Sequence, residues 1–264
     1  MSIAFSVDLE PNKDGTFDGV GEAMSWVDVT VPQATIYATH RAATNRPEIL
    51  ESFVADHEIG VHVHPKEFGY EADDLARLPR QRQRELIGKT RQTVASAAGL
   101  NPGDLTAFRA GRHKAGPETL AVLSDMGFEI DASVNIRYRE HMPAGVIDRS
   151  IPFEHGSGLV ELPTTYGEPS LLSRVGLRAG LGGNITATAH ELRTDRRFCS
   201  GLRALSWLFG ATDGIVSMYM HPYDATSYEG LENDGLEFRQ RIETLLSETE
   251  REFVTASNIG EAIQ

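Results

Sequence analysis

Short apolar runs alternate along the chain with longer segments whose apolar positions recur every three or four residues. The short runs are typical of buried strands, and the longer segments have the periodicity of amphipathic helices. We predict seven strands, at residues 3–8, 33–39, 58–64, 105–110, 128–133, 159–164 and 214–220. Strands that alternate with helices form parallel sheets. Seven of them in this order predict an α/β fold, a closed or nearly closed β/α barrel.

Helical patterns fill the intervals between several of these strands. Periodic apolar positions predict helices at 46–56, from about 71 to 98, in "GPETLAVLSDMGF" (116–128) and in "GLEFRQRIETLLSETEREF" (235–253). Pro117 falls in the first turn of the third helix, where proline is tolerated because that backbone N–H would be unpaired anyway. The chain contains no linker-like tract and no internal repeat, so we expect one domain over residues 1–264.

Polar residues that could carry chemistry stand at or near the ends of most predicted strands. They are Asp8 and Glu10, His62 and His64, Arg109 and Arg112, Asp131, Glu161, and His221. In a β/α barrel the active site lies at the C-terminal ends of the strands. Each residue has a structural explanation when taken alone, but together they predict one active site assembled from strand ends.

The histidines of "HVHP" suggest a metal site. Side chains at positions i and i+2 of a strand share a face, so His62 and His64 can converge on one ion. Two imidazoles and a carboxylate with one open position are typical of a catalytic divalent metal, most often zinc. We therefore predict Asp8, His62 and His64 as metal ligands. The alternative is a pair of partly buried, hydrogen-bonded histidines.

The remaining strand-end residues suggest acid–base catalysis. Asp8 or Glu10 could act as the base that takes a proton from an attacking water. His221, which titrates near neutrality, could protonate a leaving amine, or it could be a capping histidine. Arg109 and Asp131 lie on neighbouring predicted strands. A pair between them would orient the carboxylate and hold its pKa down, although a purely structural ion pair is the alternative.

Composition narrows the classes of function. The net charge is −13 and the pI is near 5.1, which argues against nonspecific binding to nucleic acid or to an anionic membrane. The 264 residues, of which 40% are hydrophobic, are enough for one sizeable core. The single cysteine, Cys199, excludes an intrachain disulfide and disfavours a cysteine-based zinc site.

The expected location is the cytoplasm. No apolar run approaches the roughly 18 residues of a membrane span. The N-terminal "MSIAFSVD" has no basic region and begins a predicted strand, so we expect no secretory signal. Only four of the 25 basic residues are lysines, namely Lys13, Lys66, Lys89 and Lys114. An acidic chain that is rich in arginine and poor in lysine suggests a halophilic protein or a GC-rich genome.

Several segments resemble one protein family in their order and spacing. They are "FSVDLEP", "ATIYAT", "DHEIGVHVHP", "FRAGRHKAG", "TLAVLSDMGFEIDAS", "VELP" and "MYMHPYD", with "FVTASNIGEAI" similar to the closing segment. The family is that of the polysaccharide deacetylases, carbohydrate esterase family 4, with a NodB-homology domain. The resemblance covers residues 3 to 225. It implies a distorted (β/α)7 barrel and a divalent metal, commonly zinc. It also implies hydrolysis of N-acetyl, sometimes O-acetyl, groups on amino sugars.

The resemblance also implies roles for individual residues. Asp8 falls on the aspartates of the first motif and His62 on the first metal-binding histidine. Arg109 and Asp131 fall on the third and fourth motifs, and His221 falls on the histidine that acts as the acid.

Two positions depart from the pattern of the family. The first motif usually has two adjacent aspartates, one base and one ligand, whereas this chain has Asp8-Leu9-Glu10. The two duties could be divided between Asp8 and Glu10. The second motif usually spaces its histidines by four, which places Lys66 at the second ligand position. Lysine is an unsuitable ligand, so His64 is the predicted substitute.

One basic segment matches none of the motifs. Residues 173–203 carry six arginines against two acidic residues, in a chain that is acidic overall. The arginines are Arg174, Arg178, Arg193, Arg196, Arg197 and Arg203. We predict an insertion, within about residues 170–205, that covers the barrel mouth and binds an anionic substrate, since arginine suits phosphate. The alternative is a solvated pair of helices with local ion pairs.

Three functions are consistent with the sequence. The first is a metal-dependent deacetylase of an amino-sugar glycan or its precursor. The second is a hydrolase of another non-peptide C–N amide bond, since metal-free amidohydrolases that act on ureides also resemble this family. The third is a glycan-binding barrel that has lost its chemistry.

Overall fold

The computed structural model describes residues 1–141, 151–156, 158–167, 185–193, 200–227 and 234–263. Its main sheet has the strand order β10-β1-β2-β3-β4-β5-β7-β6, with β11 paired to the start of β1. All pairs are parallel except β6 with β7. The bounds are β1 (Ser2–Leu9), β2 (Thr35–Ala38), β3 (Glu58–Val63), β4 (Ala107–Ala110), β5 (Ile130–Asp131), β6 (Phe153–Glu154), β7 (Val160–Glu161), β10 (Ile215–Met220) and β11 (Glu252–Phe253).

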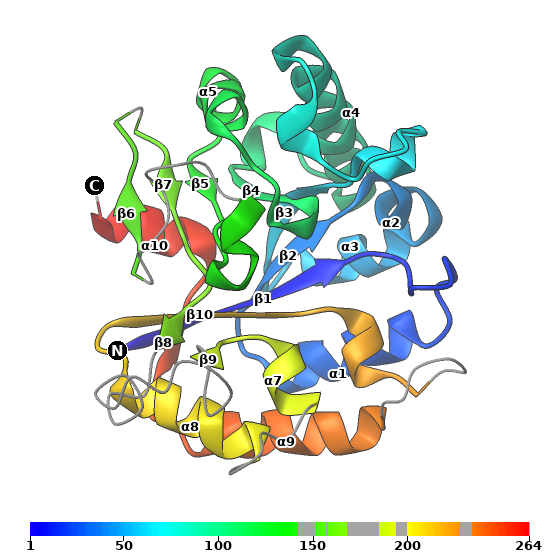
Figure 1. The fold of residues 1–264 in the computed structure, drawn as a ribbon. Helices are drawn as coiled ribbons and strands as arrows, with labels where there is room; N and C mark the ends of the chain where they lie inside the picture. The colour runs from blue at the N-terminus through cyan, green and yellow to red at the C-terminus, as the bar shows by residue number, and fades with distance from the viewer. Residues whose placement is uncertain (142–150, 157, 168–184, 194–199, 228–233, 264) are drawn as a thin grey trace.

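The sheet curls into a half-barrel with helices around its outside (Figure 1). Helices α4 and α5 lie at the top of the view, and α8 and α9 lie at the bottom. The bounds are α1 (Val20–Thr30), α2 (His40–Asn45), α3 (Pro47–Phe53), α4 (Arg80–Ala98), α5 (Pro117–Asp125), α7 (Ala189–Arg193), α8 (Gly201–Ala211), α9 (Gly235–Ser247) and α10 (Ala256–Ile263). The predicted distorted barrel of alternating strands and helices is confirmed.

The chain after β7 narrows the gap that would otherwise separate β7 from β10. The Thr164 N–H donates to the Val134 carbonyl at 2.9 Å, and the Thr165 N–H donates to the Ser217 carbonyl of β10 at 3.0 Å. A small antiparallel pair follows, β8 (Tyr166–Gly167) with β9 (Ile185–Thr186). No strand pair joins β7 directly to β10 among the described residues, so this segment, rather than a regular ladder, spans the open side of the half-barrel.

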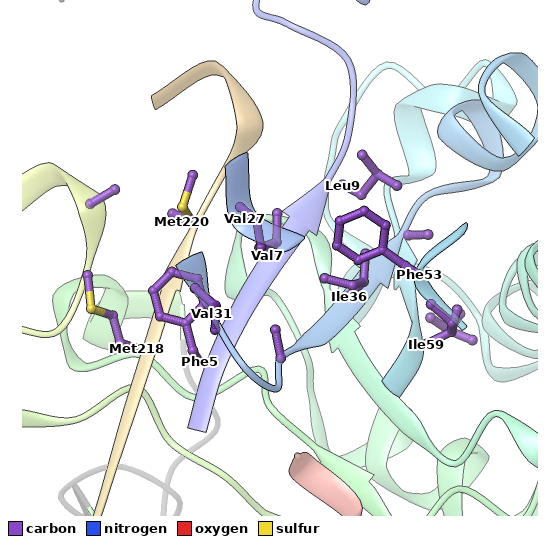
Figure 2. Packing of buried hydrophobic residues seen from close by; sticks show 14 of the residues in the cluster. Phe5, Val7, Leu9, Val27, Val31, Ile36, Phe53, Ile59, Met218 and Met220 are labelled. Carbon is purple, nitrogen blue, oxygen red and sulfur yellow. The ribbon is translucent and has the colours of Figure 1, made fainter. Parts of the chain in front are cut away.

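Alternation along β1 determines which side chains face the interior of the barrel. Phe5, Val7 and Leu9 are fully buried in the main apolar cluster between sheet and helices. Figure 2 shows Val7 beside Val27 of α1. The residues between them, including Asp8, therefore point to the other face, because successive side chains of a strand alternate.

The same alternation holds in the other strands that form the site. In β3, β4 and β10 the outward residues are apolar, namely Ile59, Val61, Val63, Phe108, Ala110, Val216, Met218 and Met220. His62, Arg109 and Tyr219 occupy the positions between them. A register shift of one residue would bury these polar groups among the helices and expose apolar side chains that each contribute about 1.5–3 kcal/mol. The core therefore fixes the register that presents the site.

Most predicted elements are present, with changed boundaries where proline or strand pairing intervenes. The helix expected from 71 begins at Arg80, directly after Pro79, and a 3-10 turn at Leu75–Arg77 precedes it. The helix expected over 235–253 ends at Ser247, because β11 pairs beside β1 instead. Helix α1 was not predicted, although Val20, its first residue, begins an apolar repeat at helical spacing.

No helix of the described residues is both long enough and apolar enough to cross a membrane.

Candidate active site

A polar cavity of about 530 Å³ opens at the C-terminal ends of the strands. Asp8, Glu10, His62, His64 and His221 all line it. With Arg112, which also lines the cavity, the structure thus brings together six of the residues that the sequence singled out, from β1, β3, β4 and β10 and the turns that follow them. Asp131 and Arg109 do not line the cavity, and each is placed below.

Glu10, His62 and His64 form a group that could hold a metal ion, with ligand atoms that all lie within 4.8 Å of one another. The Nε2 atoms of the two histidines are 3.0 Å apart. Oε2 of Glu10 lies 2.9 Å from Nε2 of His64 and 3.7 Å from Nε2 of His62. We predicted Asp8 beside the two histidines, and in the structure Glu10 takes that place.

The outer ring nitrogens of both histidines are held by acceptors. Nδ1 of His62 donates to the Arg109 carbonyl at 2.9 Å, and Nδ1 of His64 donates to Oδ2 of Asp73 at 2.7 Å. These bonds leave both Nε2 atoms to face Glu10. Metal-binding histidines are oriented in this way by their second nitrogen. The donor set therefore fits a divalent cation.

The charge around His64 favours a cation at the same point. Burial alone would lower the pKa of His64. Hydrogen bonds to the carboxylates of Asp73 and Glu10 outweigh burial and raise the pKa to about 10. Burial opposes ionisation of Asp73 too, yet its interactions with His64, the Lys66 N–H and Arg112 together lower its pKa to about 2. Two carboxylates thus flank the imidazole and stabilise positive charge, which a bound metal ion would also provide.

The close packing of the second histidine requires a glycine on the neighbouring strand end. A Cβ atom on Gly111 would lie 2.6 Å from Nδ1 of His64, closer than real Cβ contacts. The next two residues, Arg112 and His113, have left-handed backbone angles, with φ of 53° and 57°. Such strain in residues other than glycine costs about 1–3 kcal/mol each and clusters at functional sites. The loop after β4 is therefore shaped around the site.

Asp8 is buried beside this group and is paired with Arg109. Nη1 of Arg109 donates to Oδ1 of Asp8 at 2.5 Å, while Oδ2 of Asp8 lies 3.9 Å from Nε2 of His221. Burial works against ionisation of Asp8, but the Arg109 guanidinium and the neighbouring histidines together outweigh burial and lower the pKa of Asp8. Asp8 is therefore ionised and can accept a proton on the oxygen that faces His221.

The expected pair of Arg109 and Asp131 is wrong. Arg109 crosses the barrel interior to Asp8 and donates from Nη2 to Ser6 Oγ at 3.0 Å. Its Cζ atom lies over the Tyr37 ring, 4.2 Å from the ring centroid. The strand register explains the difference. Asp131 pairs with Phe108 rather than with Arg109, so the side chains of Asp131 and Arg109 lie on opposite faces of the sheet.

Asp131 belongs to a separate buried group with Glu161, its register partner on β7. Ser133 donates to Oδ1 of Asp131 from both its N–H and its hydroxyl. Oε1 of Glu161 accepts from the Val134 N–H at 2.9 Å, and Oε2 lies 3.3 Å from Nε2 of His155. Burial raises the pKa of Glu161 to about 8 and raises that of Asp131 well above its usual value. The two carboxyls therefore hold a proton near neutral pH.

This pair predicts a pH dependence of stability. A carboxyl whose pKa is raised on folding stabilises the protein below its unfolded pKa of about 4.3, and that contribution is lost as the pH rises through the folded pKa. The free energy of unfolding should thus fall by as much as about 1.4 kcal/mol per unit between pH 5 and 8. Glu161→Gln should flatten this fall, because the amide keeps the bond to Val134 and carries no charge. Urea unfolding at several pH values measures both slopes.

Glu154→Gln, an exposed change on β6, is the matched control for Glu161→Gln. A slope equally steep in wild type and Glu161→Gln would contradict the assignment.

His221 follows β10, which neighbours β1 on the side away from β3, the strand that leads to His62 and His64. Its Nε2 lies 3.5 Å from Oε1 of Glu10, and its Nδ1 lies 3.4 Å from Oδ2 of Asp224. The ring stacks on Tyr223 with 4.5 Å between centroids. Burial alone would lower the pKa of His221, but the carboxylates of Asp224, Glu10 and Asp8 outweigh burial and raise it. The imidazole can therefore supply a proton next to Asp8.

Three supporting residues were not predicted from the sequence. Asp73, which holds His64, lies nine positions further along the chain, at the start of the segment predicted as a helix from 71, and in the structure it lies in the loop before α4. Asp224, which holds His221, follows it by three and also accepts its backbone N–H at 2.9 Å. Tyr219 was within reach of the strand argument, because it shares a face with His221. Its hydroxyl lies 3.0 Å from Nε2 of buried His113.

The predicted basic insertion is described only in part. Its described residues form β9, α7 and the start of α8. Arg193 pairs with Asp224 at 3.2 Å and so supports the partner of His221. Arg203 follows Ser200, whose hydroxyl accepts its N–H at the start of α8. Arg174, Arg178, Arg196 and Arg197 lie outside the described residues, so the predicted substrate contact of this segment stays a prediction.

Comparison with known proteins identifies the fold. No protein-family model and no curated protein matches the sequence. Among solved structures, a candidate polysaccharide deacetylase from Mycobacterium smegmatis matches with a TM-score of 0.64 and 17% identity, over 99% of this chain and 89% of that one. A family 4 carbohydrate esterase from Streptomyces lividans, in complex with acetate, matches with a TM-score of 0.51 and 11% identity, over 94% of this chain and 88% of that one. The fold is that of the polysaccharide deacetylases.

Other proteins with this fold differ in activity. The Puue allantoinase matches with a TM-score of 0.59 and 14% identity, over 98% of this chain and 89% of that one. The matches also include a family 4 pseudoenzyme from Bacillus anthracis. The fold is thus shared by proteins described as a carbohydrate esterase, an allantoinase and a pseudoenzyme, so the fold alone does not determine the activity of this chain.

Proposed function

We propose that this protein is a metal-dependent hydrolase that removes acetyl groups from amino sugars of a glycan or glycan precursor. The observation that carries the proposal is the grouping of Glu10, His62 and His64, with Asp8 and His221 on its flank. These residue types in one cavity supply every group that amide hydrolysis requires.

Glu10, His62 and His64 would hold a divalent cation, for which zinc is the usual occupant of such ligands. When bound, the ion supplies Lewis acidity that polarises the amide carbonyl and favours ionisation of water. Asp8 takes the proton of the attacking water on the oxygen that Arg109 leaves free. Arg109 is a positioning residue, because it touches Asp8 and does not line the cavity.

His221 would carry out the second proton transfer, to the leaving amine. Cleavage of the C–N bond leaves an amine that must gain a proton before it departs. The imidazole is held at Nδ1 by Asp224 and directs Nε2 into the cavity, 3.5 Å from Glu10 and 3.9 Å from Asp8. His221 is thus placed to donate that proton. Tyr138, Tyr219 and Tyr223 also line the cavity and add aromatic surface to it.

Metal content and acetate release test the proposal together. The protein is purified without a histidine tag, its metals are quantified by mass spectrometry, and acetate is assayed after incubation with N-acetylated oligosaccharides. We expect about one divalent ion per chain and release of acetate that a chelator abolishes and zinc restores. A chain that binds no metal after reconstitution and releases no acetate would refute the proposal.

A second function shares the same geometry. The allantoinase with this fold supports a hydrolase of a linear or cyclic amide outside the sugars. Ammonia or a carboxylate product released from such amides, without acetate from N-acetyl sugars, would favour this alternative. Retained glycan binding without metal or turnover would instead favour a non-catalytic barrel.

A further inference from the structure

The loops around the cavity carry a row of basic side chains that the proposed chemistry does not use. Each of four successive strands, β1 to β4, is followed by one basic residue that lines the cavity. They are Lys13 after β1, Arg41 at the start of α2, Lys66 in the turn Pro65–Phe68 and Arg112 in the turn Gly111–His113. In Figure 1 the four strands are neighbours in the curled sheet. The basic residues therefore form an arc along one side of the cavity mouth.

This arc contrasts with the charge of the whole chain. The chain has 38 acidic and 25 basic residues, and only four of the basic residues are lysines. Two of those lysines, Lys13 and Lys66, line this one cavity. The same lining also holds four acidic residues, Asp8, Glu10, Glu67 and Asp73, so the cations available to an anionic ligand are those that no carboxylate neutralises. A cation at the cavity mouth that no carboxylate neutralises favours a ligand that carries negative charge.

Three of the four acidic residues that line the cavity contact groups other than the side chains of Arg41, Lys66 and Arg112, whereas the fourth, Asp73, pairs with Arg112 at 3.1 Å. Asp8 is bound by Arg109, and Glu10 by the two metal-site histidines. Glu67 accepts the backbone N–H of Arg41 at 3.0 Å, which leaves the guanidinium of Arg41 to bind the Gly15 carbonyl at 2.6 Å. No carboxylate among the described residues forms an ion pair with the side chain of Arg41 or of Lys66, so these two cations of the arc keep their charge.

Asp73 fixes part of the arc directly beside the metal site. Its Oδ2 binds His64 at 2.7 Å and Nε of Arg112 at 3.1 Å, and its Oδ1 accepts the backbone N–H of Lys66 at 3.3 Å. One carboxylate thus positions a metal-site histidine and the two cationic residues. Lys66 is exposed, and its ammonium group makes no ion pair with any described residue.

We infer that the substrate carries a phosphate or carboxylate group near the amide that is hydrolysed, and that Lys66 is the main residue that binds this anion. The inference rests on the proposed amide hydrolysis and names the substrate class: an anionic, rather than a neutral, N-acylated sugar. Arg41 and Arg112 add positive charge on either side. Lysine is a compact, mobile cation that can follow an anionic group at the cavity mouth.

Binding of matched product pairs tests the inference without any turnover. Calorimetry compares glucosamine 6-phosphate with glucosamine, and muramic acid serves as the carboxylate probe, so the two anion sources are distinguished. Because the amino group is common to all three, the difference in affinity isolates the anion. We expect the preferred anionic sugar to bind at least about tenfold more tightly than glucosamine, in line with a charged hydrogen bond. Raising the salt concentration should reduce this preference, because exposed charges are screened.

Variants assign the preference to the arc. Lys66→Met should remove most of it, and Lys66→Arg should keep it. Arg82→Met removes one exposed charge from α4, far from the cavity lining, and should leave it unchanged. Equal affinity for neutral and anionic sugars, or equal losses in Lys66→Met and Arg82→Met, would overturn the inference. If neutral N-acetylglucosamine were hydrolysed as well as its 6-phosphate, the inference would fail while the proposed function held. Anion binding that depends on Lys66, without hydrolysis of any amide, would show the reverse.

Discussion

Replacing His62 with alanine should release the metal ion and lower amide hydrolysis by at least about a thousandfold. The change removes one of the two imidazoles of the group, and a site with one histidine and one carboxylate holds a divalent ion poorly. His62 is also almost completely buried, and its Nδ1 bonds to the Arg109 carbonyl. His64, on the same face of the strand, cannot replace the missing imidazole of His62, because His64 is already one of the metal ligands.

The test of His62 compares metal content, acetate release and unfolding in parallel. His62→Gln keeps more of the buried volume and guards against a variant that fails to fold. His40→Gln is the matched control, because His40 lies on α2, bonds to Thr93 and does not line the cavity. Full metal content in a folded His62 variant would show that the ion is bound at another site. Unchanged hydrolysis in that variant would contradict the role of the site.

Strand alternation explains why much of the candidate site could be predicted. Parallel strands covered by helices read as apolar runs, and a polar residue inside such a run must face the barrel interior. His62 interrupts the apolar run of β3, and His64 follows at the next inward position. The same logic applies to Asp8 and Glu10. Both pairs line one cavity because the C-terminal ends of β1 and β3 lie at the same edge of the sheet.

The departure at Lys66 has a simple structural reason. Strand β3 ends at Val63, and Pro65 begins a 3-10 turn. The inward alternation therefore reaches His64 but does not extend to Lys66, which lies in the turn and is exposed. In this chain the second imidazole comes from the strand side of the turn, and Glu10, two residues beyond Asp8, is the carboxylate that faces it.

The partners of the site residues could not be predicted, because they depend on register and on loops. Arg109 and Asp131 stand at the ends of neighbouring strands, yet an offset of one residue places them on opposite faces. Asp73 falls at the start of the segment predicted as a helix from 71, and only the loop that actually precedes α4 brings it to His64. Local sequence patterns determine the face of a strand, whereas contacts between elements depend on how the elements are aligned.

Asp8→Asn and Glu10→Gln should separate the base from the ligand. Asp8→Asn removes the proton acceptor but leaves Glu10, His62 and His64 in place, so it should keep the metal and lower kcat about 10²- to 10⁴-fold. Glu10→Gln removes the only carboxylate of the metal group, so it should lower metal affinity first and activity as a consequence. Metal titration and acetate release, measured on both variants, distinguish the two roles.

The control for these variants must account for Arg109. Asp8→Asn leaves the buried guanidinium without its opposite charge, and breaking a buried ion pair costs about 3–5 kcal/mol. Activity is therefore referred to the folded fraction, measured by unfolding under the assay conditions. Asp14→Asn, which removes an exposed carboxylate from the same loop outside the cavity lining, should change neither metal content nor kcat.

If Asp8→Asn loses the metal while Glu10→Gln keeps it, the roles are exchanged, and Asp8 is the ligand that the sequence predicted. The two departures from the family pattern would then be unrelated. The expected result instead makes them one matched change, in which a carboxylate and an imidazole each lie two residues beyond the first residue of their motif.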